Sequence, residues 1–454
     1  MSLQSIDPTT GEPFAQYEET NPDQIDSILR EATKAFCTWR SVSFEGRAEV
    51  LRKAAAILRE ERSDFARLMA REMGKPIRQG RSEAEKCAWV CDYYADNAEE
   101  FLRAQSVETD ASRSYVAFVP VGPVLAVMPW NFPFWQVFRF VAPALMAGNV
   151  AIVKHASNVS GCALAIADIF SRSGLPKGAF STVLLRGADV LPLIADRAVA
   201  AVTVTGSTPA GRMVAAAAGK ALKKSVLELG GSDPYLVLED ADLDLAAKAC
   251  VTSRLINTGQ SCIAAKRFIV IRSRLAEFEN KVVAAMESAT MGDPANEETD
   301  LGPLARLDLR EELHRQVEQS VQRGAKLLLG GSIPDGPGAF YPATVLTNVA
   351  PGMPAHDEEL FGPVAAIVPA VDEADAVFLA NHTVFGLGAA VFSADLTRAE
   401  RVAAEIETGS VFINGFVKSD PRLPFGGIKE SGYGRELGPF GIREFVNIKT
   451  RWIR

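Results

Sequence analysis

Cys262 stands in a segment where a small hydrophobic residue would be poorly placed. It is the last residue of NTGQSC (257–262), a polar segment. This segment covers the end of an expected helix over 251–260 and precedes an expected strand over 267–271. Most lone cysteines pack in the core, but a turn presents backbone N–H groups that stabilise a thiolate. Cys262 is therefore a candidate nucleophile, with a buried structural cysteine as the alternative.

Glu228 lies inside the apolar sequence VLELGG (226–231). Because a carboxylate is costly to bury, one interpretation is an exposed residue on an alternating strand. The flanking leucines and the two glycines favour another interpretation, in which a strand ends here and partial desolvation raises the pKa of Glu228. Such a carboxylate can take a proton from water near neutral pH, which makes Glu228 a candidate general base.

The sequence PWNFPFW (129–135) directly follows a buried strand expected over 124–128 and so lies at the carboxyl end of that strand. Two prolines fix the backbone, and Asn131 is the one amide side chain among apolar neighbours. Its N–H could stabilise an oxyanion together with a backbone N–H at the nucleophile. An aromatic packing corner is the alternative.

Two further segments favour an anionic ligand. TGSTPAG (205–211) joins an expected strand to a helix, and a helix N-terminus offers free N–H groups and positive potential to a pyrophosphate. The segment is not the G-x-G-x-x-G fingerprint. Lys154 ends the strand VAIVK (150–154), and it could be either a snorkelling surface residue or a ribose ligand.

The elements that must position these residues follow a change of hydrophobic period. Helical spacing dominates up to about residue 101, with a capped start at Asn21 and a second helix over 44–60. Short apolar strands then alternate with helices, first over 124–228 and again over 231–438, which predicts parallel sheets built from βαβ units. The second region has expected strands at 267–271, 364–368, 388–392 and 410–413. Ligands of such sheets bind at the carboxyl ends of the strands.

We therefore predict an α/β fold with two doubly wound parallel-sheet domains and a small β extension. Residues 1–101 and 123–230 form the expected dinucleotide-binding domain, and residues 231–438 form the expected catalytic domain. Two outlying strands, at 112–122 and 445–453, could pair in a small protruding sheet. We expect their segments, 102–122 and 439–454, to mediate oligomers.

Composition excludes several classes of protein. The chain has 454 residues, 48% hydrophobic and 23% charged, with a net charge of −8, which is typical of a soluble globular protein with two or three domains. No Lys/Arg run suggests a nucleic-acid surface, and no apolar stretch is long enough to span a bilayer. Six cysteines without a CxxC pair and four scattered histidines predict neither a disulfide framework nor a metal site. The N-terminus lacks an apolar signal segment, so we expect a cytoplasmic protein.

Taken together, these motifs resemble the aldehyde dehydrogenase superfamily, and within it the bacterial succinate-semialdehyde dehydrogenases. PWNFP, the strand-ending Lys154, TGS, LELGG and NTGQSC occur in the family's order over essentially the whole chain. They are followed by EELFGP (358–363), PFGG (424–427), SG (431–432) and GRE (434–436). The resemblance implies oxidation of a small aldehyde with NAD or NADP by a homodimer or homotetramer.

The resemblance also implies a role for each residue. Cys262 attacks the aldehyde, Asn131 meets the oxyanion of the thiohemiacetal, hydride passes to the nicotinamide, and Glu228 activates the water that hydrolyses the resulting thioester. The cofactor-binding residues are Trp130, Lys154, Ser157, Gly206, Ser207, Leu229, Glu359 and Phe361. The substrate-binding residues are Phe132, Arg139, Ser261 and Phe425.

The prediction of the substrate class rests on Arg139. It lies in the apolar sequence VFRF (137–140), where an arginine is expensive unless paired, so an internal salt bridge is the alternative. Its placement is similar to that of an arginine that grips the distal carboxylate in succinate-semialdehyde dehydrogenases, a task for which guanidinium geometry is suited. Ile256 stands where that group has a second arginine, and either Lys418 or Arg422 could supply the missing charge. A glutarate-semialdehyde or general aliphatic aldehyde dehydrogenase remains the alternative function.

Three other positions refine the resemblance. NAD-preferring members of the family usually have Glu where this chain has Ser157, so we predict that NADP is accepted alongside NAD. Phe140 replaces a Lys of some proton relays in the family, and the sequence therefore does not support Glu436 as a relay member. Glu228 argues against a CoA-acylating enzyme, in which the residue that activates water is typically absent. Cys262 and Glu228 together argue against a non-catalytic protein built on this fold.

Overall fold

A six-stranded sheet forms the centre of the first half of the molecule. The computed structural model describes residues 2–454, and the strand order in this sheet is β19-β9-β8-β5-β6-β7. The sheet consists of β5 (Pro123–Met128), β6 (Val150–His155), β7 (Phe180–Val183), β8 (Ala201–Thr205), β9 (Lys224–Glu228) and β19 (Gly432–Tyr433). Strands β5 to β9 are parallel, as predicted. The late strand β19 pairs antiparallel with β9 and places Gly432 opposite Glu228.

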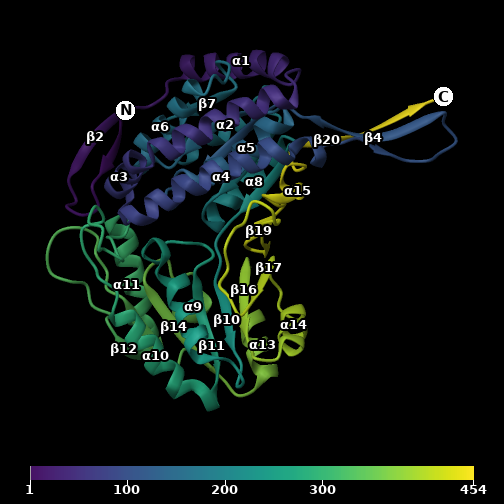
Figure 1. Ribbon diagram of the computed structural model, residues 1–454. Helices are drawn as coiled ribbons and strands as arrows, with labels where there is room; N and C mark the ends of the chain where they lie inside the picture. Colours follow the sequence, from purple (N-terminus) through teal and green to yellow (C-terminus); the bar gives the residue numbers. More distant parts are fainter. Residues whose placement is uncertain (1) are drawn as a thin grey trace.

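Helices cover this sheet (Figure 1). They are α1 (Pro22–Trp39), α2 (Phe44–Glu60), α3 (Arg62–Met73), α4 (Ile77–Phe101), α5 (Trp135–Ala147), α6 (Ser160–Arg172), α7 (Leu191–Ala195) and α8 (Thr208–Lys220). The predicted start of α1 is confirmed, because Asn21 and Gln24 form a capping box there. All residues of α5 are buried. This helix therefore carries Arg139 into the interior, next to α4.

The second sheet has seven strands in the order β12-β13-β14-β11-β10-β16-β17. Its strands are β10 (Asp233–Val237), β11 (Ala265–Ile271), β12 (Lys326–Leu329), β13 (Thr344–Thr347), β14 (Val364–Ala370), β16 (Gly388–Phe392) and β17 (Ser410–Ile413). The helices around them are α9 (Leu243–Leu255), α10 (Leu275–Glu287), α11 (Leu307–Gln322), α12 (Pro354–Asp357), α13 (Glu373–Asn381) and α14 (Leu396–Ala404). Only β12 is antiparallel to its neighbour. One apolar cluster lies on each face of the sheet, as expected for buried parallel strands.

A three-stranded sheet extends away from both of these regions (Figure 1). It contains β3 (Gln105–Ser106), β4 (Arg113–Pro120) and β20 (Val446–Ile453), and the short helix α15 (Gly438–Gly441) precedes β20. The predicted pairing of the two outlying strands is confirmed, because β20 runs antiparallel to β4 along its full length. β20 is exposed from Asn447 onward. A role of this arm in oligomers stays a prediction, and so do the domain boundaries.

The structure departs from the expectations in three places. The chain begins with a hairpin of β1 (Ser2–Ile6) and β2 (Pro13–Glu18) that helical periodicity did not indicate, and β15 (Phe385–Gly386) pairs with β18 (Ile428–Lys429). The helix expected over 251–260 ends at Leu255 and continues only as a short 3-10 turn. Within residues 2–454, no helix has the length and apolarity needed to cross a membrane.

Candidate active site

The backbone before Cys262 adopts an uncommon conformation. Asn257 and Thr258 both have a φ of 55°, and Gly259 follows with a φ of 76°. Left-handed backbone is costly for residues other than glycine, so the surroundings must hold it. The Asn257 side chain does so, because its Nδ2 donates to the carbonyl oxygens of Asn131 at 2.6 Å and Gln260 at 3.1 Å. The loop of residues 257–262, which ends at Cys262, is therefore joined to the loop that carries Asn131.

Lys266 holds the same loop from the opposite side, and no sequence motif marked it. Its buried Nζ donates to the carbonyl oxygens of Ser261 at 2.9 Å and Cys262 at 2.6 Å, and it lies 3.2 Å from Glu359 Oε1. The same Glu359 oxygen accepts from the backbone N–H of Gly231 at 3.0 Å. One signal could have found Lys266, since it stands inside the apolar strand β11. Charge on a buried strand requires such partners.

Cys262 is protonated at rest. Its side chain is partly accessible, but the surrounding protein desolvates the sulfur, and burial raises the pKa of Cys262 to about 12. The charges of Glu359 and Glu228 act in the same direction, whereas Lys266 and Arg139 lower the pKa of Cys262. The two cations are thus the groups that favour the thiolate when it forms.

Glu228 is buried, so the interpretation of an exposed strand residue is wrong. The side chain is 2% exposed, and neither carboxylate oxygen has a hydrogen-bond partner among the described residues. Its Oε1 would lie 2.7 Å from a Cβ atom at Gly426, so only glycine leaves room there. The pKa of Glu228 is raised to about 8, chiefly by burial; Arg139 and Arg435 lower this pKa, and Glu436 raises it. A buried carboxylate with this pKa is suited to general-base work near neutral pH.

Arg139 forms an internal salt bridge, which the sequence analysis gave as the alternative to a substrate-binding role. It is 2% exposed, and its Nε is ion-paired with Glu436. Its Nη2 donates to Thr205 Oγ1 at 3.2 Å, and its guanidinium lies 4.8 Å from the Phe425 ring centroid. Within residues 2–454, Nη1 has no hydrogen-bond partner. Arg139 also lines the cavity described next.

A cavity of about 570 Å³ opens onto Cys262. All four predicted substrate-binding residues line it, namely Phe132, Arg139, Ser261 and Phe425. Sequence motifs missed a second set of lining residues: Gln79, Ser82, Glu83 and Lys86 on α4, Trp135 and Gln136 on α5, and Ser419 in a loop. Ile256, which the sequence placed at the position of the second arginine, also lines the cavity. Asn131 lies beside the cavity, where its Nδ2 donates to Gln260 O at 3.1 Å. An amide has two N–H donors, so one remains for an oxyanion.

Most of the predicted cofactor-binding residues lie at the carboxyl ends of strands in the first sheet, whereas Glu359 and Phe361 lie just before β14 of the second sheet. Lys154 is the penultimate residue of β6 and is 6% exposed, so it is not a snorkelling surface residue, and burial lowers its pKa. Ser157 is exposed just beyond it. Ser207 caps α8, and the space beside Gly206 is open. The other predicted residues lie at neighbouring turns: Leu229 against Gly211, Glu359 beside Gly230, and Trp130 with its ring 5.7 Å from that of Phe361. An anionic dinucleotide fits this row of helix N-terminus, lysine and open glycine.

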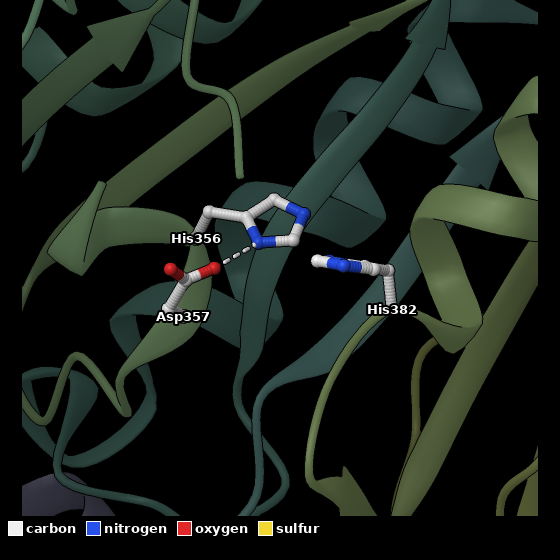
Figure 2. Close-up of side chains that lie close together, drawn as sticks. All are labelled: His356, Asp357 and His382. Atoms are coloured by element: carbon white, nitrogen blue, oxygen red, sulfur yellow. Dashed lines mark hydrogen bonds and ion pairs between the residues drawn. The ribbon is translucent and has the colours of Figure 1, made fainter. Parts of the chain in front are cut away.

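The fold also brings together two histidines that are distant in sequence. Figure 2 shows His356 and His382 beside Asp357, and His356 Nδ1 lies 2.7 Å from Asp357 Oδ1. Burial and the positive charge of Arg267 lower the pKa of His356 to about 4. The same positive charge opposes the binding of a metal cation there. None of the three residues lines the cavity at Cys262.

The chain is similar to known proteins over its whole length. The aldehyde dehydrogenase family model matches residues 1–451. A probable succinate-semialdehyde dehydrogenase [NADP(+)] of Synechocystis sp. is 51% identical over 453 residues, with all of both chains covered. The succinate semialdehyde dehydrogenase [NAD(P)+] Sad of Escherichia coli is 49% identical, covering 99% of this chain and 97% of that protein.

The fold agrees as well. The crystal structure of succinic semialdehyde dehydrogenase from Streptococcus pyogenes in complex with NADP+ superimposes with a TM-score of 0.97. Its sequence is 38% identical, and the match covers 99% of both chains. The whole-length sequence match and this agreement in fold establish that the chain belongs to the aldehyde dehydrogenase family.

Proposed function

We propose that this enzyme oxidises succinate semialdehyde to succinate with NADP or NAD. The observation that carries the proposal is Arg139, a buried arginine that lines the same cavity as Cys262 and whose Nη1 has no hydrogen-bond partner within residues 2–454. A guanidinium suits a carboxylate, and succinate semialdehyde carries one at the end opposite to the aldehyde. The names of the relatives from Synechocystis and Escherichia coli support the same substrate.

The chain's own residues supply each step except the hydride transfer. Cys262 forms the bond to the aldehyde carbon, and the free N–H of Asn131 stabilises the oxyanion. A nicotinamide held in this groove would supply the hydride acceptor, so that the group on Cys262 becomes a thioester. Glu228 takes a proton from water, and the attack of that water releases the carboxylic acid. Lys154, Ser207 and Glu359 would hold the cofactor along the carboxyl ends of β6, β8 and β9.

The surroundings of the site complete the proposal. The edge strand β20, which is exposed from Asn447 onward, offers an edge through which two chains could pair, so we expect a homodimer or homotetramer. We expect the enzyme in the cytoplasm, where its six cysteines remain free thiols.

Replacing Arg139 tests the substrate class. In Arg139→Leu we expect kcat/KM for succinate semialdehyde to fall by at least about tenfold, the value of one charge-assisted hydrogen bond, while propanal oxidation falls less. Because this change leaves Glu436 as an unpaired buried carboxylate, the variant should also lose about 3–5 kcal/mol of stability.

The double variant Arg139→Leu/Glu436→Gln separates these two effects. It removes the unpaired charge, and we expect it to regain thermal stability without regaining selectivity for the semialdehyde. Equal losses on propanal and on succinate semialdehyde in both variants would mean that Arg139 only maintains the fold, and the proposed substrate would then be wrong.

Ser157 makes a second prediction, on the cofactor. Its exposed hydroxyl does not repel a 2′-phosphate, so kcat/KM for NADP should lie within about a thousandfold of that for NAD, a difference of roughly 4 kcal/mol. Ser157→Glu should shift this ratio towards NAD by at least about tenfold, because like charges repel. Steady-state rates at matched aldehyde concentration measure both values. A wild-type preference for NAD above the stated limit would contradict the prediction.

A further inference from the structure

The face of α4 that borders the cavity carries a lysine without a counter-ion. Gln79, Ser82, Glu83 and Lys86 recur at helical spacing, and all four line the cavity. Opposite them, α5 presents Arg139. The fold thus places two cations from adjacent helices at one cavity that also contains Cys262.

The contacts of Lys86 leave its charge uncompensated. Its Nζ donates to Ser419 Oγ at 2.7 Å and lies 4.3 Å from the Trp135 ring centroid, but it forms no ion pair with any residue in the described range 2–454. The neighbouring Glu83 is not available, because it is ion-paired with Lys75 and accepts from the backbone N–H groups of α5. Burial, and then the charge of Arg139, lower the pKa of Lys86 to about 8. A bound anion would favour the charged form of Lys86 and so oppose the lowering of its pKa by burial and by Arg139.

Lys418 and Arg422, the two cations suggested by the sequence, are less suited than Lys86 to bind an anion in this cavity. Arg422 is held by both carboxylate oxygens of Asp420 and lies over Trp89, and it does not line the cavity. Lys418 lines the cavity but is exposed, so water screens its charge. Ile256, which stands in place of the expected second arginine, contributes only apolar surface.

We propose that Lys86, together with the Ser419 hydroxyl and Nη1 of Arg139, binds the distal carboxylate of the substrate. The inference rests on the proposed function and names the second cation that Ile256 does not provide. Arg139 is already fixed by Glu436 and Thr205, so it supplies one N–H to the carboxylate. Lys86 has no fixed counter-ion, and it turns from Ser419 towards the incoming anion. A neutral aldehyde gains nothing from either group.

The test compares Lys86→Met with Lys418→Met, using succinate semialdehyde and butanal as substrates. We expect Lys86→Met to lower the ratio of kcat/KM for succinate semialdehyde to that for butanal by at least about tenfold, mainly through KM. Lys418→Met should change this ratio by less than about threefold. Lys86→Arg keeps the charge and should keep most of the selectivity.

A binding measurement covers the case in which Lys86→Met turns over poorly. Succinate should protect Cys262 of the wild-type enzyme from alkylation by iodoacetamide, and Lys86→Met should need at least about tenfold more succinate for half-protection. An unchanged selectivity ratio and unchanged protection in Lys86→Met overturn the role of Lys86, as does a larger effect of Lys418→Met. If the wild-type enzyme itself does not prefer succinate semialdehyde to butanal, the proposed function fails, and the inference fails with it.

Discussion

Cys262→Ala is expected to lower kcat for aldehyde oxidation by at least about 10⁴-fold. Without the sulfur no thiohemiacetal forms, and Asn131 has no oxyanion to stabilise. The fold should persist, because the cavity at Cys262 is already open and Lys266 still has the carbonyl oxygens of residues 261 and 262 to bind. Spectrophotometric formation of NADPH measures the loss, and quenching of tryptophan fluorescence by NADP tests whether the cofactor still binds.

Cys37→Ala is the matched control. Cys37 is an exposed free thiol on α1, outside the cavity, and its replacement should change kcat by less than about twofold. Residual turnover above about one per cent of wild type in Cys262→Ala, with cofactor binding intact, would show that another group forms the covalent intermediate.

Glu228→Gln should separate the two halves of the reaction. We expect steady-state kcat to fall by about 10²–10⁴, because the amide cannot take a proton from water. Reduction of one cofactor equivalent per site should still occur as a burst, since the acyl group then remains on Cys262. Rapid mixing followed by intact-protein mass spectrometry would detect this thioester.

The pH dependence of the wild-type enzyme provides a second signature of Glu228. Burial raises the pKa of Glu228 to about 8, so the base is protonated below that pH and the rate of thioester hydrolysis should rise as the pH increases through it. In Glu228→Gln this rise should be absent. Hydroxylamine, which cleaves thioesters without a protein base, should restore turnover in the variant. A variant with neither a burst nor rescue by hydroxylamine would instead place Glu228 before the formation of the thioester.

The local chemistry of this site can be predicted from sequence because each motif is contiguous. The nucleophile loop, the turn after Glu228 and the loop of Asn131 each combine a strand or helix end with glycine, proline or amide residues. Fold class follows for the same reason, since apolar strands such as β16 and β17 have the predicted boundaries. The hairpin of β1 and β2 was not predicted because its strands are short, polar and only half-buried.

The rest of the site depends on contacts between residues far apart in the chain. The partner of Arg139 is Glu436, and Lys75 is ion-paired with Glu83, which lies on the same face of α4 as Lys86. Periodicity shows that α4 has a buried side, but it does not show what faces that side. A lysine on an amphipathic helix is usually solvated, so only the cavity distinguishes Lys86 from the other lysines of the first helices.

The antiparallel strand β19 has a consequence for synthesis of the chain on the ribosome. Parallel strands β5 to β9 are complete once residue 228 has emerged, but β19, Gly426 and Glu436 follow about two hundred residues later. A nascent chain must therefore hold the edge of β9, with Glu228 on it, uncovered while the second sheet is made. The last strand, β20, pairs with β4 only after the terminal residues leave the exit tunnel. In truncated products Glu228 should therefore remain uncovered, and the sheet of β4 and β20 should not form. Any factor that binds exposed strand edges should recognise such products as unfinished.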